Sequence, residues 1–305
     1  MPLLLDRPFS RRSALAAGLT PGELRGLVSA RLVRRVLDGV YVGADVPDSF
    51  ELRCAAVALA LPAGAALCRE GAAWLYGVDT RDPARRDDPP RLDIAVPRGT
   101  TIVRRRGIRC FVQDLSPVDL RLLDGVAVTS PLRTGIDLAR WLPRPDALCA
   151  LDALAHTGVL DLDEARAGIV RWAEHAFVVQ AREVLVLADA GSESWGESRC
   201  RLRLHDAGFP APELQICVRI GDRSFRLDMG WKARRKALEY DGEAHHSSAD
   251  DRASDQERRA LLRRAGWDVA VVTKEHVLGG GTGFEQVVAE LLGMPPTRGP
   301  ASDWR

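Results

Sequence analysis

A run of closely spaced β-like segments in the last third of the chain constrains its fold more than any other feature. Residues 215–220 and 224–229 predict two strands joined by a Gly-Asp turn, and residues 235–246 begin with a third. Short runs rich in apolar residues with turn residues between them favour hairpins. A helix over 252–265, with its arginines expected to face outward, precedes a fourth strand at 268–272. The last third is therefore predicted to be an α/β domain.

Three carboxylates are expected to meet on these strands. Alternate residues of a strand share a face, so Glu239 and Asp241 point the same way, and the hairpin can bring Asp228 beside Glu239. Like charges on one face repel, and a hard divalent cation such as Mg²⁺ would offset that repulsion. The alternative is that Asp228 and Glu239 are exposed and pair with the many nearby arginines.

This segment resembles the core of the PD-(D/E)xK nuclease superfamily, in the branch of endonuclease-like domains similar to very-short-patch repair endonucleases. The resemblance rests on Asp228, on Glu239 to Gly242 and on His245-His246, and it extends upstream to Glu197 and Gln215. It implies a restriction-endonuclease-like domain with a central mixed sheet, which uses Mg²⁺ or Mn²⁺ to cleave double-stranded DNA.

The resemblance also implies roles for individual residues. Asp228, Glu239 and Asp241 would hold the metal, and a histidine would orient water or protonate the leaving oxygen. The third motif position carries Asp241 where lysine is usual, which leaves the general base unassigned. Glu197 also fits a helix cap, and the alternative for the histidines is a polar loop. The candidate catalytic residues are Asp228, Glu239, Asp241, His245, His246 and Glu197.

Residues 1–45 carry the pattern of a small DNA-binding module. Residues 20–23 form a capping box that starts a helix, and β-rich runs at 32–36 and 40–42 bracket an Asp-Gly hairpin signal. Helix, helix and hairpin in this order predict a winged helix-turn-helix, which can place a helix in a major groove. The alternative is a module that only packs on its neighbour. The candidate DNA-binding residues are Arg25, Arg31, Arg34 and Arg35.

The same segment, with residues 54–77 after it, resembles the N-terminal part of AbiEi-type antitoxins of abortive-infection systems. The matching features are the run from Leu32 to Val42 and the helix at 69–74, and residues 46–190 are similar to the middle domain of that family. This resemblance implies a DNA-binding repressor or antitoxin with a toxin or phage-defence partner, whose nuclease-like domain no longer cleaves. Endonuclease and repressor are thus the two hypotheses for function.

Composition bounds both hypotheses. The net charge is +1, so contact with nucleic acid would need local basic patches. The six cysteines form no C-x-x-C pair, and no apolar run is long enough for a membrane span, so a cytoplasmic protein is expected. The predicted parts are a winged helix (1–45), an α/β middle domain (46–190), a nuclease-like domain (191–293) and a disordered tail (294–305).

Overall fold

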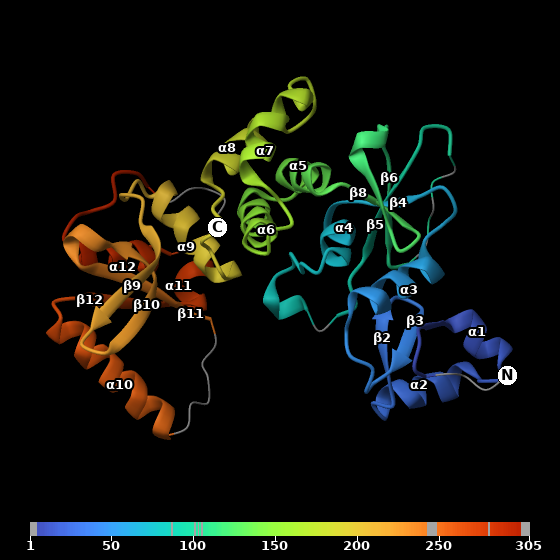
Figure 1. The fold of residues 1–305 in the computed structure, drawn as a ribbon, viewed down its shortest axis with the longest axis horizontal. Coiled ribbons are helices and arrows are strands. Elements are labelled where there is room, and N and C mark those ends of the chain that lie inside the picture. The colour runs from blue at the N-terminus through green and yellow to red at the C-terminus, as the bar shows by residue number, and fades with distance from the viewer. Residues whose placement is uncertain are drawn as a thin grey trace. The chain divides into compact units, whose positions relative to one another are not determined.

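The chain folds into two compact units, each of which mixes helices and strands (Figure 1). The computed structural model describes residues 5–86, 88–100, 102, 104, 106–242, 249–279 and 281–299, without the side chains of Arg85 and residues 249–255. The first unit comprises Met1–Trp141 and Thr157–Arg182, and the second comprises Leu142–His156 and Glu183–Arg305. No helix in the described part of the chain is long and apolar enough to cross a membrane.

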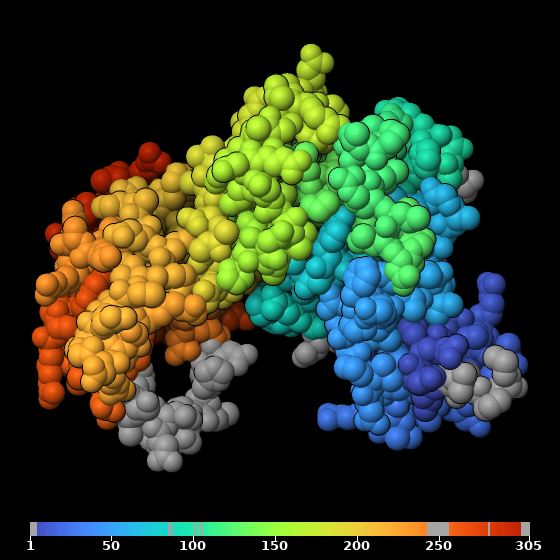
Figure 2. All heavy atoms as spheres, viewed as in Figure 1, coloured from blue at the N-terminus to red at the C-terminus, as the bar shows by residue number. Residues whose placement is uncertain are grey.

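The first unit begins with two short helices and a three-stranded sheet. The elements are β1 (Phe9–Ser10), α1 (Arg11–Ala16), α2 (Pro21–Ser29), β2 (Val33–Leu37) and β3 (Val40–Gly43), with strand order β1-β3-β2. The predicted capping box is present, because Thr20 Oγ1 accepts a hydrogen bond from Glu23 N and Glu23 Oε2 accepts one from Thr20 N. The predicted hairpin is present as β2 and β3. In the space-filling view the dark blue α1–α2 segment and the lighter blue hairpin form one continuous surface (Figure 2).

A five-stranded mixed sheet forms the rest of the first unit. Its order is β6-β5-β4-β8-β7, with parallel β4–β8 and β5–β6 pairs and two antiparallel pairs. The elements are α3 (Phe50–Ala60), β4 (Ala66–Leu67), α4 (Arg69–Leu75), β5 (Leu92–Val96), β6 (Ile108–Val112), β7 (Leu120–Leu123), β8 (Val126–Thr129), α5 (Pro131–Trp141) and α7 (Leu162–Gly168), and α8 (Val178–Leu187) begins here. Short 3-10 turns lie at Pro83–Arg85, Pro117–Asp119 and Ile169–Trp172.

The hairpin is buried on both of its faces. Val33 and Tyr41 pack with Leu24 of α2, whereas Val36 and Val42 belong to the core that contains α3, α4 and the five-stranded sheet. Burial of apolar surface on both sides fixes the hairpin firmly. The two N-terminal helices are therefore attached, through the hairpin, to the core of the five-stranded sheet. They do not form a compact unit of their own.

The second unit is built on a four-stranded sheet of order β12-β11-β10-β9, in which β9, β10 and β11 are antiparallel and β12 runs parallel to β11. This confirms a central mixed sheet. The elements are α6 (Arg144–His156), α9 (Trp195–Asp206), β9 (Glu213–Ile220), β10 (Arg223–Trp231), β11 (Lys236–Asp241), α10 (Ala249–Arg264), β12 (Asp268–Thr273), α11 (Lys274–Leu278) and α12 (Gly283–Leu292), with a 3-10 turn at Lys232–Arg234.

The strands of this sheet carry a core on each face. Leu238 packs with residues of α9, α11 and α12, whereas Ala237 packs with Leu262 of α10. The alternation predicted for β11 is thus confirmed. Gly196 allows α9 to approach this strand, because a Cβ there would lie 1.9 Å from the ring of Tyr240.

The end of the chain is attached to this second unit. The sequence predicts a disordered tail from residue 294, but Thr297 N and Arg298 N both donate hydrogen bonds to the carbonyl of Ala207, at 2.9 and 3.1 Å. Thr297 Oγ1 also donates a hydrogen bond to the carbonyl of Gly208, so polar groups of this segment find partners on the backbone that follows α9. The described part of the segment, up to residue 299, is therefore held by hydrogen bonds.

Candidate functional site

A groove rich in arginine lies along the N-terminal helices and the hairpin. It has a volume of about 1100 Å³, and Asp38 is the single acidic residue among its described lining. A concave surface lined by charges of one sign concentrates the field and attracts ions of the opposite sign. The groove is therefore suited to a polyanion such as a nucleic-acid backbone. Its arginines are Arg11, Arg12, Arg25, Arg35 and Arg106.

The structure brings together two of the four predicted DNA-binding arginines. Arg25 of α2 and Arg35 of β2 are exposed and both line the groove. Arg31 is exposed beyond the end of α2 and Arg34 is half-buried, and neither belongs to the groove lining. Arg34 Nη2 donates to the carbonyl of Val46 at 2.9 Å, which gives this side chain a structural partner.

The other three arginines of the groove are not among the residues predicted to bind DNA. Arg11 and Arg12 open α1, whose cap is Ser10, and the cap is the signal that could have placed them at an exposed helix start. Arg106 belongs to a basic run, but its side chain reaches the hairpin, with Nε 3.8 Å from Asp38 Oδ2. Arg35 Nη1 lies 3.9 Å from Asp38 Oδ1, so Asp38 stands between these two cations.

A second candidate site is the carboxylate cluster on the sheet of the second unit. The β10–β11 register pairs Met229 with Leu238, which brings Asp228 and Glu239 together one step further along. Asp228 Oδ2 accepts a hydrogen bond of 2.9 Å from Tyr240 N. Burial, followed by the charges of Glu197 and Glu239, raises the pKa of Asp228 to about 6 against the opposing effect of that hydrogen bond. A carboxyl with a raised pKa beside two others is a common feature of functional sites.

Glu239 is held by an arginine. Arg258 of α10 donates from Nη1 to Glu239 Oε2 at 2.9 Å and from Nη2 to Glu239 Oε1. It also donates to the carbonyl of Arg226 at 3.1 Å. The expectation that this arginine faces outward is wrong, because the bidentate ion pair turns it toward the sheet. For Glu239, the alternative of pairing with a nearby arginine is the arrangement observed.

Glu197 and Gln215 complete the cluster. Glu197 is buried, and its Oε2 accepts 3.0 Å hydrogen bonds from Glu193 N and from Gln215 Nε2. Its own N donates a hydrogen bond to Oγ of the cap residue Ser194, so Ser194 caps the helix as expected, while the Glu197 side chain bonds the N of Glu193 and not that of Ser194. Gln215 has a φ of 50° and a buried Oε1 that finds no partner among the described residues. Strained backbone and unsatisfied polar atoms concentrate at functional sites, and both mark Gln215.

Of the remaining predicted residues, the structure describes Asp241 alone. Asp241 is exposed at the end of β11, and its carboxylate makes no hydrogen bond or ion pair with a described residue. His245 and His246 lie outside the described residues. Within the described residues, no group of three or more His, Cys, Asp and Glu side chains is arranged to hold a metal ion. With both Glu239 oxygens on Arg258, the cluster in this arrangement does not fit a metal.

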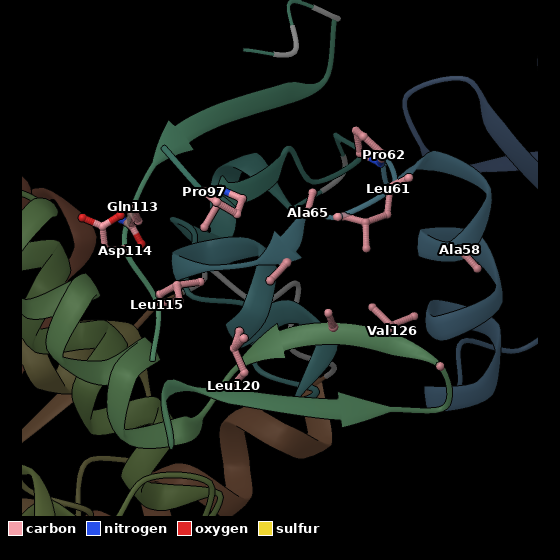
Figure 3. A pocket seen from close by; sticks show the side chains of 16 residues that line it. Ala58, Leu61, Pro62, Ala65, Pro97, Gln113, Asp114, Leu115, Leu120 and Val126 are labelled. Carbon is pink, nitrogen blue, oxygen red and sulfur yellow. The ribbon is translucent and has the colours of Figure 1, made fainter. Parts of the chain in front are cut away.

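A pocket in the first unit is lined mainly by apolar residues. It has a volume of about 580 Å³ and lies over the five-stranded sheet, with Gln113 and Asp114 at one end and Val126 at the other (Figure 3). Most of its lining is small and apolar, including Ala65 and Pro97. Its described lining contains no cluster of titratable side chains, so it is not a candidate site.

Two curated proteins share most of this chain. They are uncharacterized protein MT2308 of Mycobacterium tuberculosis strain CDC 1551 / Oshkosh and uncharacterized protein Rv2248 of strain ATCC 25618 / H37Rv. Each is 32% identical over 245 residues, which cover 80% of this chain and 86% of the relative. This chain belongs to the same family as Rv2248. A family with uncharacterized members gives no function by itself.

Within this Rv2248-family chain, residues 63–186 match the AbiEi antitoxin C-terminal domain. The match runs from the turn before β4 to the end of α8 and includes the five-stranded sheet. The expected AbiEi resemblance is therefore found over this range. A chain in the crystal structure of the RV2827C protein from Mycobacterium tuberculosis aligns with a TM-score of 0.32 and 14% identity, over 59% of this chain and 71% of its own. That similarity is too low to support an argument about fold.

Proposed function

We propose that this protein is a DNA-binding regulator of the antitoxin type, and that residues 5–43 act as a winged helix-turn-helix on double-stranded DNA. The groove with five arginines carries the proposal. The AbiEi antitoxin domain at residues 63–186 supports it, and implies a toxin or phage-defence protein as the regulated partner.

The proposed contact uses both helices and the hairpin. The α2 helix enters the major groove and presents Arg25, while β2 and β3 form the wing beside it and present Arg35. Arginine forks bind phosphate oxygens in a bidentate manner. Because the hairpin is packed on both faces, these cations are held in position before DNA arrives, which lowers the ordering cost of binding.

Two neighbouring arginines provide a matched test. Full-length wild-type protein, Arg35→Ala and Arg34→Ala are titrated into a labelled duplex at low salt, and affinity is measured by fluorescence anisotropy. Arg35→Ala should weaken binding, because its side chain lines the groove. Arg34→Ala should bind DNA like the wild type, because Arg34 is engaged with Val46. Equal losses in both variants, or none in either, would refute the assignment of the groove.

A second candidate function is metal-dependent endonuclease, which the cluster of Glu197, Asp228 and Glu239 favours. The order helix, three antiparallel strands, helix and parallel strand (α9 to β12) also fits a PD-(D/E)xK nuclease domain. On this hypothesis Mg²⁺ or Mn²⁺ is the cofactor and Asp228, Glu239 and Asp241 are its ligands, with His245 or His246 assisting. Cleavage would require the ion pair between Arg258 and Glu239 to open.

An assay of plasmid nicking distinguishes the two candidate functions. Supercoiled plasmid is incubated with Mg²⁺ or Mn²⁺ and either wild-type protein or Asp228→Ala. An endonuclease nicks the plasmid only when Asp228 is intact. If the wild type and Asp228→Ala both bind the plasmid and neither nicks it, the nuclease hypothesis is excluded and the DNA-binding regulator remains.

A further inference from the structure

One arginine of the first unit lies against two aromatic rings and has no acidic partner among the described residues. The guanidinium carbon of Arg69 lies 3.7 Å from the ring centre of Phe111 and 4.6 Å from that of Trp141. Its Nε is buried and unbonded, and the guanidinium makes no hydrogen bond or ion pair with any described residue. The two rings attract the cation through cation–π interactions.

The carboxylates nearest to Arg69 already have other partners. Asp93 is bonded by Arg109, with Nη2 2.7 Å from Oδ2. Asp137 is fully buried and is bonded by Arg133 at 2.8 Å and by Arg140 at 3.4 Å. Arg69 is therefore the cation of this group that has no ion-pair partner in the described chain.

This arrangement is maintained at a cost in free energy. Burial lowers the pKa of Arg69, although the charges of Asp137 and Asp93 oppose that effect. A half-buried cation without a hydrogen-bonded anion is unfavourable. The backbone adds strain, because Arg69 has a φ of 48°, a left-handed conformation that is uncommon for residues with a side chain such as arginine. Such features persist where a ligand completes the site.

An apolar surface lies beside this guanidinium. Trp141 is 42% exposed and Phe177 is 56% exposed, and their rings meet edge to face at 4.9 Å. Phe177 also has a left-handed backbone, with a φ of 61°. Tryptophan and arginine are the residue types most enriched in the hot spots of protein–protein interfaces.

We propose that Arg69, Phe111, Trp141 and Phe177 form a docking site for a partner protein that presents a carboxylate beside an apolar side chain. The carboxylate would pair with Arg69 through a bidentate ion pair, and the apolar side chain would cover Trp141 and Phe177. Double-stranded DNA is a poorer occupant, because a phosphate backbone offers no apolar group to cover the exposed rings of Trp141 and Phe177. The site is also separate from the described lining of the arginine groove, so it does not depend on the proposed DNA contact.

The test uses full-length protein and two matched series of fluorescein-labelled pentapeptides. The first series has a central glutamate flanked by Leu, Phe or Trp, and the second has glutamine in its place. Saturable binding of one or more glutamate peptides is expected, with at least a tenfold loss on the change to glutamine. Absence of saturable binding up to the solubility limit of the peptides would overturn the proposal.

Variants locate the binding. Arg69→Asn should no longer bind the glutamate peptide, because it lacks the guanidinium. The variant should stay folded, because asparagine tolerates a left-handed backbone. Phe177→Gly removes an exposed ring and should lower the affinity for the peptide several-fold. The control is Arg98→Asn, which removes an exposed arginine paired with Asp114 and should bind the peptide like the wild type. Thermal melting of each variant checks that it is folded.

Two outcomes contradict the site. Undiminished peptide binding by both Arg69→Asn and Phe177→Gly would place the peptide elsewhere. Loss of duplex-DNA affinity in Arg69→Asn, as large as the loss in Arg35→Ala and without loss of peptide, would assign Arg69 to DNA.

Discussion

Replacing Asp228 with asparagine should make the protein more stable at neutral pH. Burial raises the pKa of this carboxyl from 3.8 to about 6, so the folded state disfavours its ionised form. This difference of about two pKa units corresponds to at most about 3 kcal/mol of unfolding free energy, at 1.36 kcal/mol per unit. Asparagine is neutral at every pH, and its amide oxygen can still accept the hydrogen bond from Tyr240 N.

The sign of the pH dependence follows from the direction of the shift. A group with a raised folded-state pKa stabilises the fold while it is protonated, and that stabilisation is lost as pH rises from about 4 through the folded-state pKa of about 6. The wild type should therefore lose stability over this window relative to Asp228→Asn. Above the window, the difference between the two proteins should reach its full value and stay constant.

Urea unfolding of both proteins at pH 4, 5, 6 and 7.5 measures this difference. Nearly equal stability is expected at pH 4, and a gain of about 2–3 kcal/mol for Asp228→Asn is expected at pH 7.5. Glu193→Gln is the matched control, because it removes a carboxylate from a solvent-accessible ion pair with Arg226, and such pairs contribute at most about 1 kcal/mol. An Asp228→Asn protein that is no more stable than the wild type at pH 7.5 would show that Asp228 ionises freely.

Three further substitutions test the packing around the sites. Arg203→Met should destabilise the protein by about 3–5 kcal/mol in urea unfolding, because it leaves Glu285 buried without its cation; no loss would contradict that ion pair. Gly196→Ala should cost about 1–3 kcal/mol and lower the melting temperature, since its Cβ meets the ring of Tyr240; an unchanged melting temperature would mean that α9 is not so close to β11. Thr20→Ala should cost about 1 kcal/mol through loss of the capping box, and Glu23→Gln, which can keep the box, should cost less.

Local signals allowed much of the fold to be predicted. The capping box at residues 20–23, the Asp-Gly hairpin and the alternation along β11 each depend on neighbours within a few residues, and the structure contains all three. The sequence does not predict β4 or β7. These strands have two and four residues, too few for a period to show, and they form because the neighbouring strands supply hydrogen-bond partners.

Long-range contacts explain what the sequence could not show at the candidate sites. The ion pair between Arg258 and Glu239 depends on where α10 lies against β11, and no periodicity of α10 distinguishes this arginine from its neighbours. Arg203 is likewise buried, although it lies in a helix rich in charged residues, because Glu285 and several carbonyls of distant segments surround it. The gathering of Arg11 and Arg106 in one groove has the same origin.

Salt dependence of binding to duplex DNA tests the central proposal most directly. Affinity is measured between about 50 and 200 mM salt for the wild type and for Arg25→Ala/Arg35→Ala, and log affinity is plotted against log salt. If both side chains of the groove contact phosphates, the slope for the double variant should be shallower by about 1.8, at about 0.9 per contact. Equal slopes for the two proteins, or no binding by the wild type at low salt, would contradict a DNA-binding role for this groove.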